Sequence, residues 1–133
     1  MLLRFILIIL IAFTASSCGR QGSNTNDIFD VYGYKQITQA EAKAIIDSGD
    51  SYILLDVRTQ EEYDEQRIPG ALLIPVADLE EAAERELPDK DAVIMIYCQT
   101  GIRSVTASEI LVDLGYVNVF EIGGIITWEY ETE

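Results

Sequence analysis

Apolar and polar positions divide the chain after about residue 30 into alternating short strands and helices. Short continuous apolar runs are typical of strands that are buried on both faces of a sheet. Such runs predict strands at residues 52–57, 71–74 and 92–97, and the alternation of elements adds strands at 34–37 and 117–122, where polar residues interrupt the apolar ones. The run at 92–97 is the most apolar of them, so we expect it at the centre of the sheet.

Helix signals fill the intervals between these runs. Residues 38–41 and 59–62 both read Thr-x-x-Glu, the order of a capping box, and predict helices that extend to about Asp47 and about Gln66. Further helices are predicted at 78–87 and 104–114, where Pro88 and Gly115 follow as helix stops. Alternating strands and helices predict an α/β domain with a mostly parallel sheet, because parallel neighbours need helical crossovers.

The first 30 residues follow a different pattern. Arg4 precedes an apolar run at 5–13, and small residues at 15–17 lead to Cys18. This run is shorter than the roughly 20 residues that span a bilayer, which favours a secretory signal over a permanent membrane helix. The small residues that end on a cysteine resemble the lipobox of bacterial lipoproteins, although Ala15 stands where that family usually has leucine.

The lipobox resemblance implies that residues 1–17 are a signal peptide and that Cys18 becomes a lipidated N-terminus. Residues 18–30, rich in Gly, Ser and Asn, then form a tether, and residues 31–133 form the domain. An ordinary signal peptide or an uncleaved anchor are the alternatives. The resemblance also implies an extracytoplasmic protein that is lipid-anchored to a bacterial membrane and faces the periplasm or the cell surface.

Composition narrows the range of functions. The chain has 133 residues, enough for one domain, and its net charge of −14 argues against nucleic acid as a partner. It has no histidine, which excludes a Ser-His-Asp or Cys-His catalytic pair and argues against a transition-metal site. We expect no metal, no cofactor and no disulfide between its two cysteines, and we expect a monomer.

Cys98 is the strongest candidate for chemistry. It follows the central predicted strand, and a short loop joins it to a helix. Active sites of open α/β sheets lie at the carboxyl ends of strands, and loop N–H groups at a helix start bind anions. Such a setting lowers the pKa of a thiol without a histidine base. The alternative is an inert cysteine that merely fills the core.

Several motifs together resemble single-domain rhodanese-like sulfurtransferases. They are the loop Cys98-Gln99-Thr100-Gly101-Ile102-Arg103-Ser104, Leu55-Asp56-Val57-Arg58, Arg67-Ile68-Pro69-Gly70-Ala71, and Gly123-Gly124-Ile125 followed by Trp128. The resemblance implies a five-stranded, mostly parallel sheet with helices on both faces. It also implies that Cys98 takes a sulfane sulfur from a small donor such as thiosulfate, forms a persulfide, and passes the sulfur to a thiol or cyanide.

Individual residues also receive roles. The resemblance implies that the backbone amides of residues 99–103 (Gln99, Thr100, Gly101, Ile102 and Arg103) hold the transferred sulfur. Arg103 adds a permanent charge and donors that can bind loop carbonyls or an anionic group of the substrate, so we expect it to organise the loop beside Cys98. Asp56 and Arg58 are expected to form a structural ion pair beneath the loop, and a direct role in the site is the alternative. Trp128 is expected to fill the core behind the loop, and a platform for the substrate is the alternative. Glu61 and Glu62 are interpreted as solvated helix residues.

Departures from the family pattern and rival functions are also visible. Gln99 stands where the family often has an arginine, so the pocket is less positive and thiosulfate is in doubt as the donor. Arg67 stands where the family usually has a histidine. A cysteine phosphatase would have a Cys-x5-Arg loop, whereas this loop is Cys-x4-Arg. A thiol–disulfide oxidoreductase would need a second cysteine nearby. A low-turnover sulfur carrier or protein-interaction module on the same fold stays open as the alternative.

Overall fold

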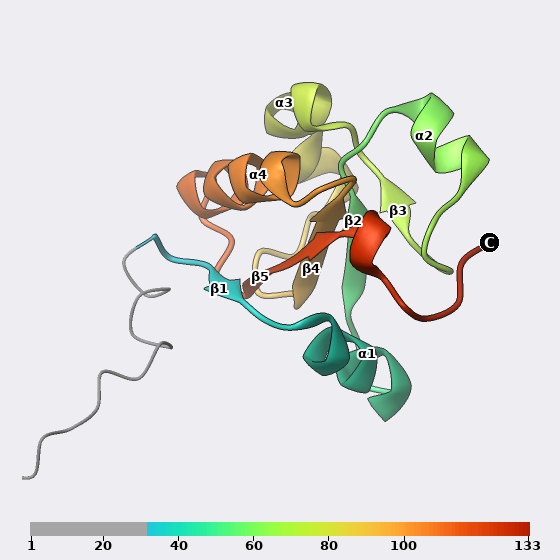
Figure 1. Cartoon of the computed structure of the whole chain (residues 1–133). Coiled ribbons are helices and arrows are strands. Elements are labelled where there is room, and N and C mark those ends of the chain that lie inside the picture. The colour runs from blue at the N-terminus through green and yellow to red at the C-terminus, as the bar shows by residue number, and fades with distance from the viewer. Residues whose placement is uncertain (1–31) are drawn as a thin grey trace, which may run out of the picture.

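A computed structural model describes residues 32–133 (Figure 1). Five parallel strands form one sheet in the order β1-β5-β4-β2-β3. Their bounds are β1 (Lys35–Gln36), β2 (Ile53–Asp56), β3 (Leu72–Leu73), β4 (Ile94–Cys98) and β5 (Val119–Gly124). The α/β prediction is confirmed, and β4, the most apolar run, lies in the centre as expected.

Helices cover both faces of the sheet, which the order of elements also predicted. Figure 1 shows α3 and α4 on one face and α1 on the other, while α2 lies near the edge strand β3. Their bounds are α1 (Gln39–Ser48), α2 (Gln60–Glu65), α3 (Val76–Glu86) and α4 (Ile102–Asp113), and a 3-10 turn, η2 (Ile125–Thr127), follows β5.

Two helix starts differ from the sequence prediction. The third helix begins at Val76 instead of Asp78, because Pro75 stands at its N-cap and has the extended backbone that starts a helix. The fourth begins at Ile102 instead of Ser104, because Gly101 adopts a left-handed φ of 98° that turns the chain out of the loop. Arg103 and Ser104 therefore lie in the first helical turn.

Both capping boxes form as predicted. Thr38 accepts a hydrogen bond from the Glu41 backbone N–H, and the Glu41 carboxylate accepts one from the Thr38 backbone N–H. Thr59 and Glu62 make the same reciprocal bonds at the start of α2. Each box satisfies N–H groups that have no partner within the helix.

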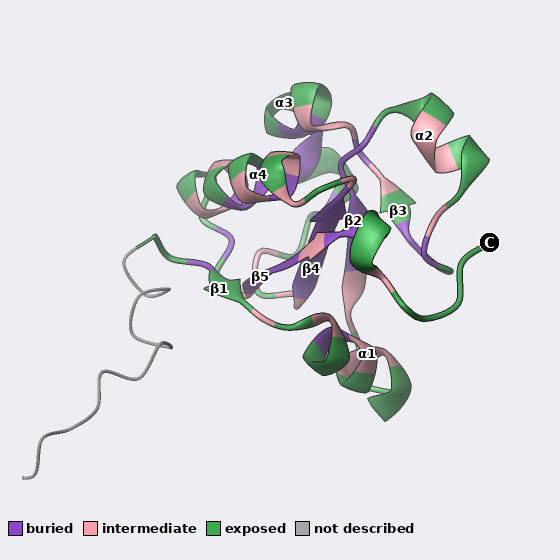
Figure 2. Cartoon of the chain, in the orientation of Figure 1, coloured by how far each residue is buried: buried purple, intermediate pink, exposed green. Residues whose placement is uncertain are grey.

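The sheet separates two apolar clusters, and buried residues fill its middle (Figure 2). One cluster lies under α3 and α4 and includes Leu55, Ile96, Cys98 and Leu111. The other lies under α1 and includes Leu54, Met95 and Tyr97. Because side chains alternate along a strand, Cys98 faces α4 whereas its neighbour Tyr97 faces the α1 side.

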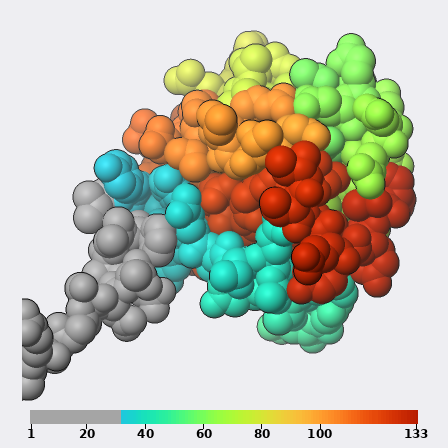
Figure 3. Space-filling view, in the orientation of Figure 1, coloured from blue at the N-terminus to red at the C-terminus, as the bar shows by residue number. Residues whose placement is uncertain are grey.

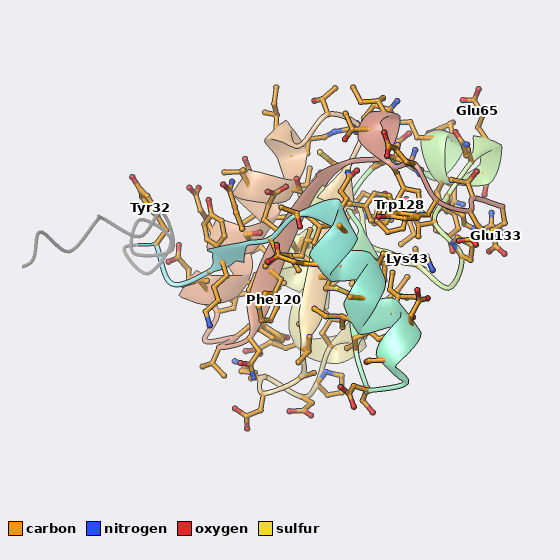
Figure 4. The ribbon with its side chains drawn as sticks, turned by 60° about the horizontal axis from the view of Figure 1, so that its bottom comes forward. Tyr32, Lys43, Glu65, Phe120, Trp128 and Glu133 are labelled. Carbon is orange, nitrogen blue, oxygen red and sulfur yellow. The ribbon has the colours of Figure 1, made fainter. Side chains whose placement is uncertain are left out.

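The C-terminal segment closes the surface between α4 and α1 (Figure 3). In Figure 4 Trp128 lies beside Lys43 of α1. Trp128 is half-buried against the cluster under α1, and its indole N–H donates to the Glu131 carbonyl at 3.1 Å. Trp128 is therefore a partial cover for the α1-side core, not a fully buried plug behind the Cys98 loop.

The predicted signal peptide, the tether and Cys18 lie outside the described residues. Within residues 32–133, no helix is long and apolar enough to cross a membrane.

Candidate active site

Cys98 is the last residue of β4, at the carboxyl edge of the sheet, and its loop leads directly into α4. Close backbone packing holds this loop. A side chain at Gly124 would collide with the Gln99 carbonyl and with Thr100, so only glycine lets β5 approach the loop this closely. The Ile126 N–H adds a hydrogen bond to the Gln99 carbonyl at 3.3 Å.

The Cys98 thiol is buried and surrounded by donors. The Gly101 N–H points at its Sγ across 3.0 Å, and the Ser104 Oγ lies 3.5 Å from it. Burial raises the pKa of this thiol, but the Ser104 hydroxyl and the backbone N–H groups of Ser104, Gly101 and Thr100 together hold the pKa below its ordinary value. The loop therefore favours a thiolate without a histidine or a metal.

A buried carboxylate lies behind the thiol. Glu121 of β5 is 5% exposed, and its Oε1 accepts hydrogen bonds from the Ser104 hydroxyl at 2.6 Å and from the Gly123 N–H at 2.8 Å. Ser104 is fully buried and lies within 3.0 Å of the Gly101 carbonyl as well. Ser104 thus connects Cys98, the loop backbone and Glu121.

A buried ion pair supports the loop from the other side. Arg58 donates to both carboxylate oxygens of Asp56, with the shortest contact, Nη2 to Oδ2, at 2.7 Å. It also reaches the Gln66 carbonyl at 2.6 Å and the Gln99 side-chain oxygen at 3.3 Å. The guanidinium lies 5.6 Å from the centre of the Tyr97 ring. Arg58 thereby joins the ends of β2 and α2 to the first loop residue.

Arg103 forms a second, half-exposed ion pair. Its two terminal nitrogens donate to the two carboxylate oxygens of Glu62 at 2.8 and 2.7 Å, a bidentate arrangement. The Arg103 hydrogen bonds, together with those from Thr59, outweigh partial burial and lower the pKa of Glu62 to about 2. Arg103 thus links the first turn of α4 to the first turn of α2.

The structure brings most of the predicted site residues together. Cys98, the loop residues 99–103 and the Asp56–Arg58 pair all lie at one edge of the sheet. Of the loop amides, those of Thr100 and Gly101 act on the sulfur, and that of Ser104, outside the predicted set, acts with them. The Arg103 side chain binds Glu62 instead of a loop carbonyl.

Three residues of the site were missed from sequence. Glu62 was interpreted as a solvated helix residue because its capping box already explained it. Ser104 is the last residue of the loop motif, and the motif alone assigns it no role. Glu121 gave the clearest signal, since it is the one acidic residue in the predicted strand at 117–122.

Among residues 32–133, no three His, Cys, Asp or Glu side chains are grouped so that they could hold a metal ion.

Comparison with known proteins shows to which family this chain belongs. The profile of the rhodanese-like domain matches residues 38–131. The chain belongs to the rhodanese-like family. A thiosulfate sulfurtransferase GlpE from Coxiella burnetii is 37% identical over 97 residues, which cover 72% of this chain and 88% of that protein. A putative sulfurtransferase YtwF from Bacillus subtilis is 35% identical over 99 residues, covering 74% and 94%.

A solved structure described as a rhodanese with anions from E. coli superimposes with a TM-score of 0.59 at 31% identity. The match covers 62% of this chain and 98% of that one. Because the family match spans α1 through η2, the Cys98 loop lies within the matched rhodanese-like domain.

Proposed function

We propose that this rhodanese-like protein is a sulfurtransferase that carries a sulfane sulfur on Cys98. The observation that supports this most is the thiol itself, which is held at the end of the central strand by loop N–H donors that lower its pKa. The sulfurtransferase relatives from Coxiella burnetii and Bacillus subtilis support the same reaction class.

The proposed reaction has two halves. The Cys98 thiolate attacks the outer sulfur of a donor such as thiosulfate, a new S–S bond forms, and sulfite leaves with the electron pair of the old one. A thiol or cyanide acceptor then attacks the outer sulfur of the persulfide and releases the Cys98 thiolate. The N–H groups of the loop stabilise the charge on sulfur in both halves, as an oxyanion hole does for oxygen.

The charges around the loop bear on which donor reacts well. Arg58 and Arg103, the two arginines at the loop, are both bound by carboxylates, and Gln99 contributes no charge. Ile102 and Ile126, which flank the loop, are 76% and 63% exposed. The surface around the loop therefore attracts a dianion such as thiosulfate only weakly. We infer that donors of low charge, such as organic persulfides, react better than thiosulfate.

A second function, a low-turnover sulfur carrier or protein-interaction module, is favoured by one observation. Cys98 is 0% exposed, so its loop has to yield before any small molecule reaches the sulfur. A protein partner that opens the loop would then control transfer. The two functions differ in turnover with small molecules alone.

Mass spectrometry of the full-length chain after incubation with thiosulfate, and separately with an organic persulfide, tests the proposal. We expect Cys98 to gain the mass of one sulfur atom, with more loading from the persulfide, and Cys98→Ser to gain none. An unmodified Cys98 with both donors would refute the sulfurtransferase. Loading without release of sulfur to cyanide or a small thiol would instead support the carrier.

We further propose that Cys18 is lipidated and holds the protein on an extracytoplasmic membrane surface, because residues 15–18 resemble a lipobox. Labelling of expressing bacteria with a palmitate analogue tests this. The wild-type chain should take up the label and sediment with membranes, and Cys18→Ala should do neither. Label on Cys18→Ala, or none on the wild type, would refute lipidation.

A further inference from the structure

Glu121 is a carboxylate in a place where carboxylates are rarely found. It is 5% exposed, on the face of β5 that packs against α4, with Ile96 of β4 beside it. Among residues 32–133, no lysine or arginine forms an ion pair with it. Burying a charge without a cationic partner is costly, so the hydrogen bonds to Glu121 have to explain its presence.

Those hydrogen bonds form a continuous path to the reactive sulfur. The Cys98 Sγ lies 3.5 Å from the Ser104 Oγ, which lies 2.6 Å from the Glu121 Oε1. A hydroxyl has one proton to donate and lone pairs to accept with. When Cys98 is a thiol, its S–H donates to Ser104 and the Ser104 O–H donates to the carboxylate, so every group has a partner.

The opposite arrangement is equally complete. When Cys98 is a thiolate, the Ser104 O–H donates to sulfur, and a protonated Glu121 donates to the Ser104 oxygen. The two arrangements differ only in the position of two protons, and the heavy atoms stay in place. The single negative charge is then on sulfur, where the N–H of Gly101 points at it.

We propose that Glu121 accepts the proton of Cys98 through Ser104 and returns it after sulfur transfer. The S–H bond breaks and leaves its electron pair on sulfur, Ser104 takes that proton while its own passes to Glu121, and the carboxylate becomes a carboxyl group. Once the acceptor has removed the sulfur, the Cys98 thiolate regains the proton by the reverse path. The scheme deepens the proposed sulfurtransferase and rests on it for its role in turnover.

The other charged groups near Glu121 do not compete for this proton. Tyr34 approaches from the β1 side, and burial, followed by Glu109 and Glu121, raises the pKa of its phenol, so Tyr34 stays protonated. Lys35 lies over the ring of Phe120, whose side chain is on the opposite face of β5. Glu109 of α4 is exposed to solvent. In a chain without histidine, Glu121 is the buried acceptor closest to the thiol along a hydrogen-bonded path.

The pH dependence of Cys98 alkylation separates this relay from a purely structural role. If Glu121 is only a fixed charge, the alkylation rate follows the thiolate alone and falls about tenfold for each pH unit below the thiol pKa. If the relay operates, the thiol–carboxylate and thiolate–carboxyl arrangements hold the same number of protons, so their ratio does not depend on pH. The wild-type alkylation rate is then nearly constant over the pH range in which Cys98 and Glu121 share one proton, and this part of the profile is its flat limb.

The experiment uses iodoacetamide on the full-length chain and follows the Cys98 peptide by mass, since Cys18 also reacts. We expect a flat limb for wild type and a loss of about tenfold per pH unit for Glu121→Gln, which keeps an oxygen for Ser104 and Gly123 but holds no transferable proton. Ser104→Ala should lose the flat limb too. Glu109→Gln, a matched charge loss on exposed α4 surface, should keep it.

A wild-type rate that falls about tenfold per pH unit would overturn the relay without any variant. So would a Glu121→Gln profile that keeps the flat limb, or one that merely moves as a whole to lower pH, as removal of a fixed negative charge predicts. Alkylation needs no sulfur donor. A flat limb with no persulfide on Cys98 would therefore refute the proposed sulfurtransferase and leave the proton path standing.

Discussion

Helices α1 and α2 begin with the same four-residue arrangement, yet only one of them belongs to the site. At α1, Glu41 closes its capping box and is exposed to solvent. At α2, Glu62 closes an identical box and also binds Arg103 through both carboxylate oxygens. The local motif fixes where each helix starts, and the position of the helix in the fold decides whether its cap does anything more.

The physical difference is what lies opposite each helix start. α1 covers the face of the sheet opposite to α4, and its first turn meets the end of β5, where Gln39 donates to the Gly124 carbonyl at 2.9 Å. α2 follows β2, whose neighbour in the sheet is β4, so its first turn faces the first turn of α4 across the loop. Glu62 therefore meets an arginine 41 residues away in sequence. The paired caps allow variants at Glu41 to serve as controls for variants at Glu62.

The largest expected effect is on stability. Glu62→Gln should lower the free energy of unfolding by about 2 kcal/mol, because it removes the charge from both hydrogen bonds to Arg103 and keeps only one side-chain oxygen to accept them, at a partly exposed site. Glu41→Gln has no arginine partner to lose and can still close its capping box, so it should cost clearly less. Urea unfolding followed by circular dichroism measures both. Equal losses in the two variants would mean that the Arg103 pair contributes nothing.

The threonines of the two boxes should behave alike. Thr38→Ala and Thr59→Ala each remove a side-chain acceptor from a helix N-terminus, which costs about 1 kcal/mol. Because both hydroxyls make only local bonds to the third residue of their helix, we expect the two losses to agree within about 0.5 kcal/mol in the same unfolding assay. A much larger loss at Thr59 would show that the α2 cap is itself coupled to the loop.

A smaller effect is expected on donor binding. Glu62→Gln leaves the Arg103 charge unneutralised beside the loop, so KM for thiosulfate should fall by a factor of about three. KM for an organic persulfide, whose reacting end carries less charge than thiosulfate, should fall less, and Glu41→Gln should change neither. Steady-state kinetics with both donors gives the comparison. A fall in KM for both donors alike would point to altered loop packing in place of charge.

The response to acid tests the same ion pair. The pKa of Glu62 is lowered to about 2 in the folded chain from 4.5 in the unfolded one. A lowered pKa means that its contribution is complete above about pH 4.5 and is lost as pH falls towards 2. The difference in unfolding free energy between wild type and Glu62→Gln should therefore shrink over that window. Urea titrations at several pH values measure it, and a difference independent of pH would contradict the ion pair.

Features encoded locally were predictable from sequence. The five strands followed from apolar runs and the alternation of elements, α1 and α2 from Thr-x-x-Glu boxes, and the central place of β4 from its lack of polar residues. Cys98 also follows from local pattern, because a cysteine after a buried strand and before a helix lies at the usual edge for sites. The start of α4 was misplaced because the left-handed turn at Gly101 admits Ile102 and Arg103 into the helix.

The partners of the site residues were not predictable in this way. Arg103 was expected to bind loop carbonyls or an anionic group of the substrate, and its partner in the structure, Glu62, comes from another helix. The alternation of side chains along β5 indicates that Glu121 faces the core. It does not indicate that Ser104 of α4 is its hydrogen-bond partner. These contacts join residues that are 41 and 17 positions apart, and only the packing of α4 on the sheet brings them together.

The sequence by itself determined the α/β architecture, the two caps and the choice of Cys98 as the candidate thiol, since strand burial, helix capping and loop geometry depend on neighbours in the chain. Tertiary structure decided what surrounds that thiol. The surrounding groups are the buried Asp56–Arg58 ion pair, the partly exposed Glu62–Arg103 ion pair, and the Glu121 carboxylate that Ser104 binds. Hydrogen bonds and ion pairs act over about 3 Å. Which groups come within that distance is set by how the elements pack, and local pattern does not contain that information.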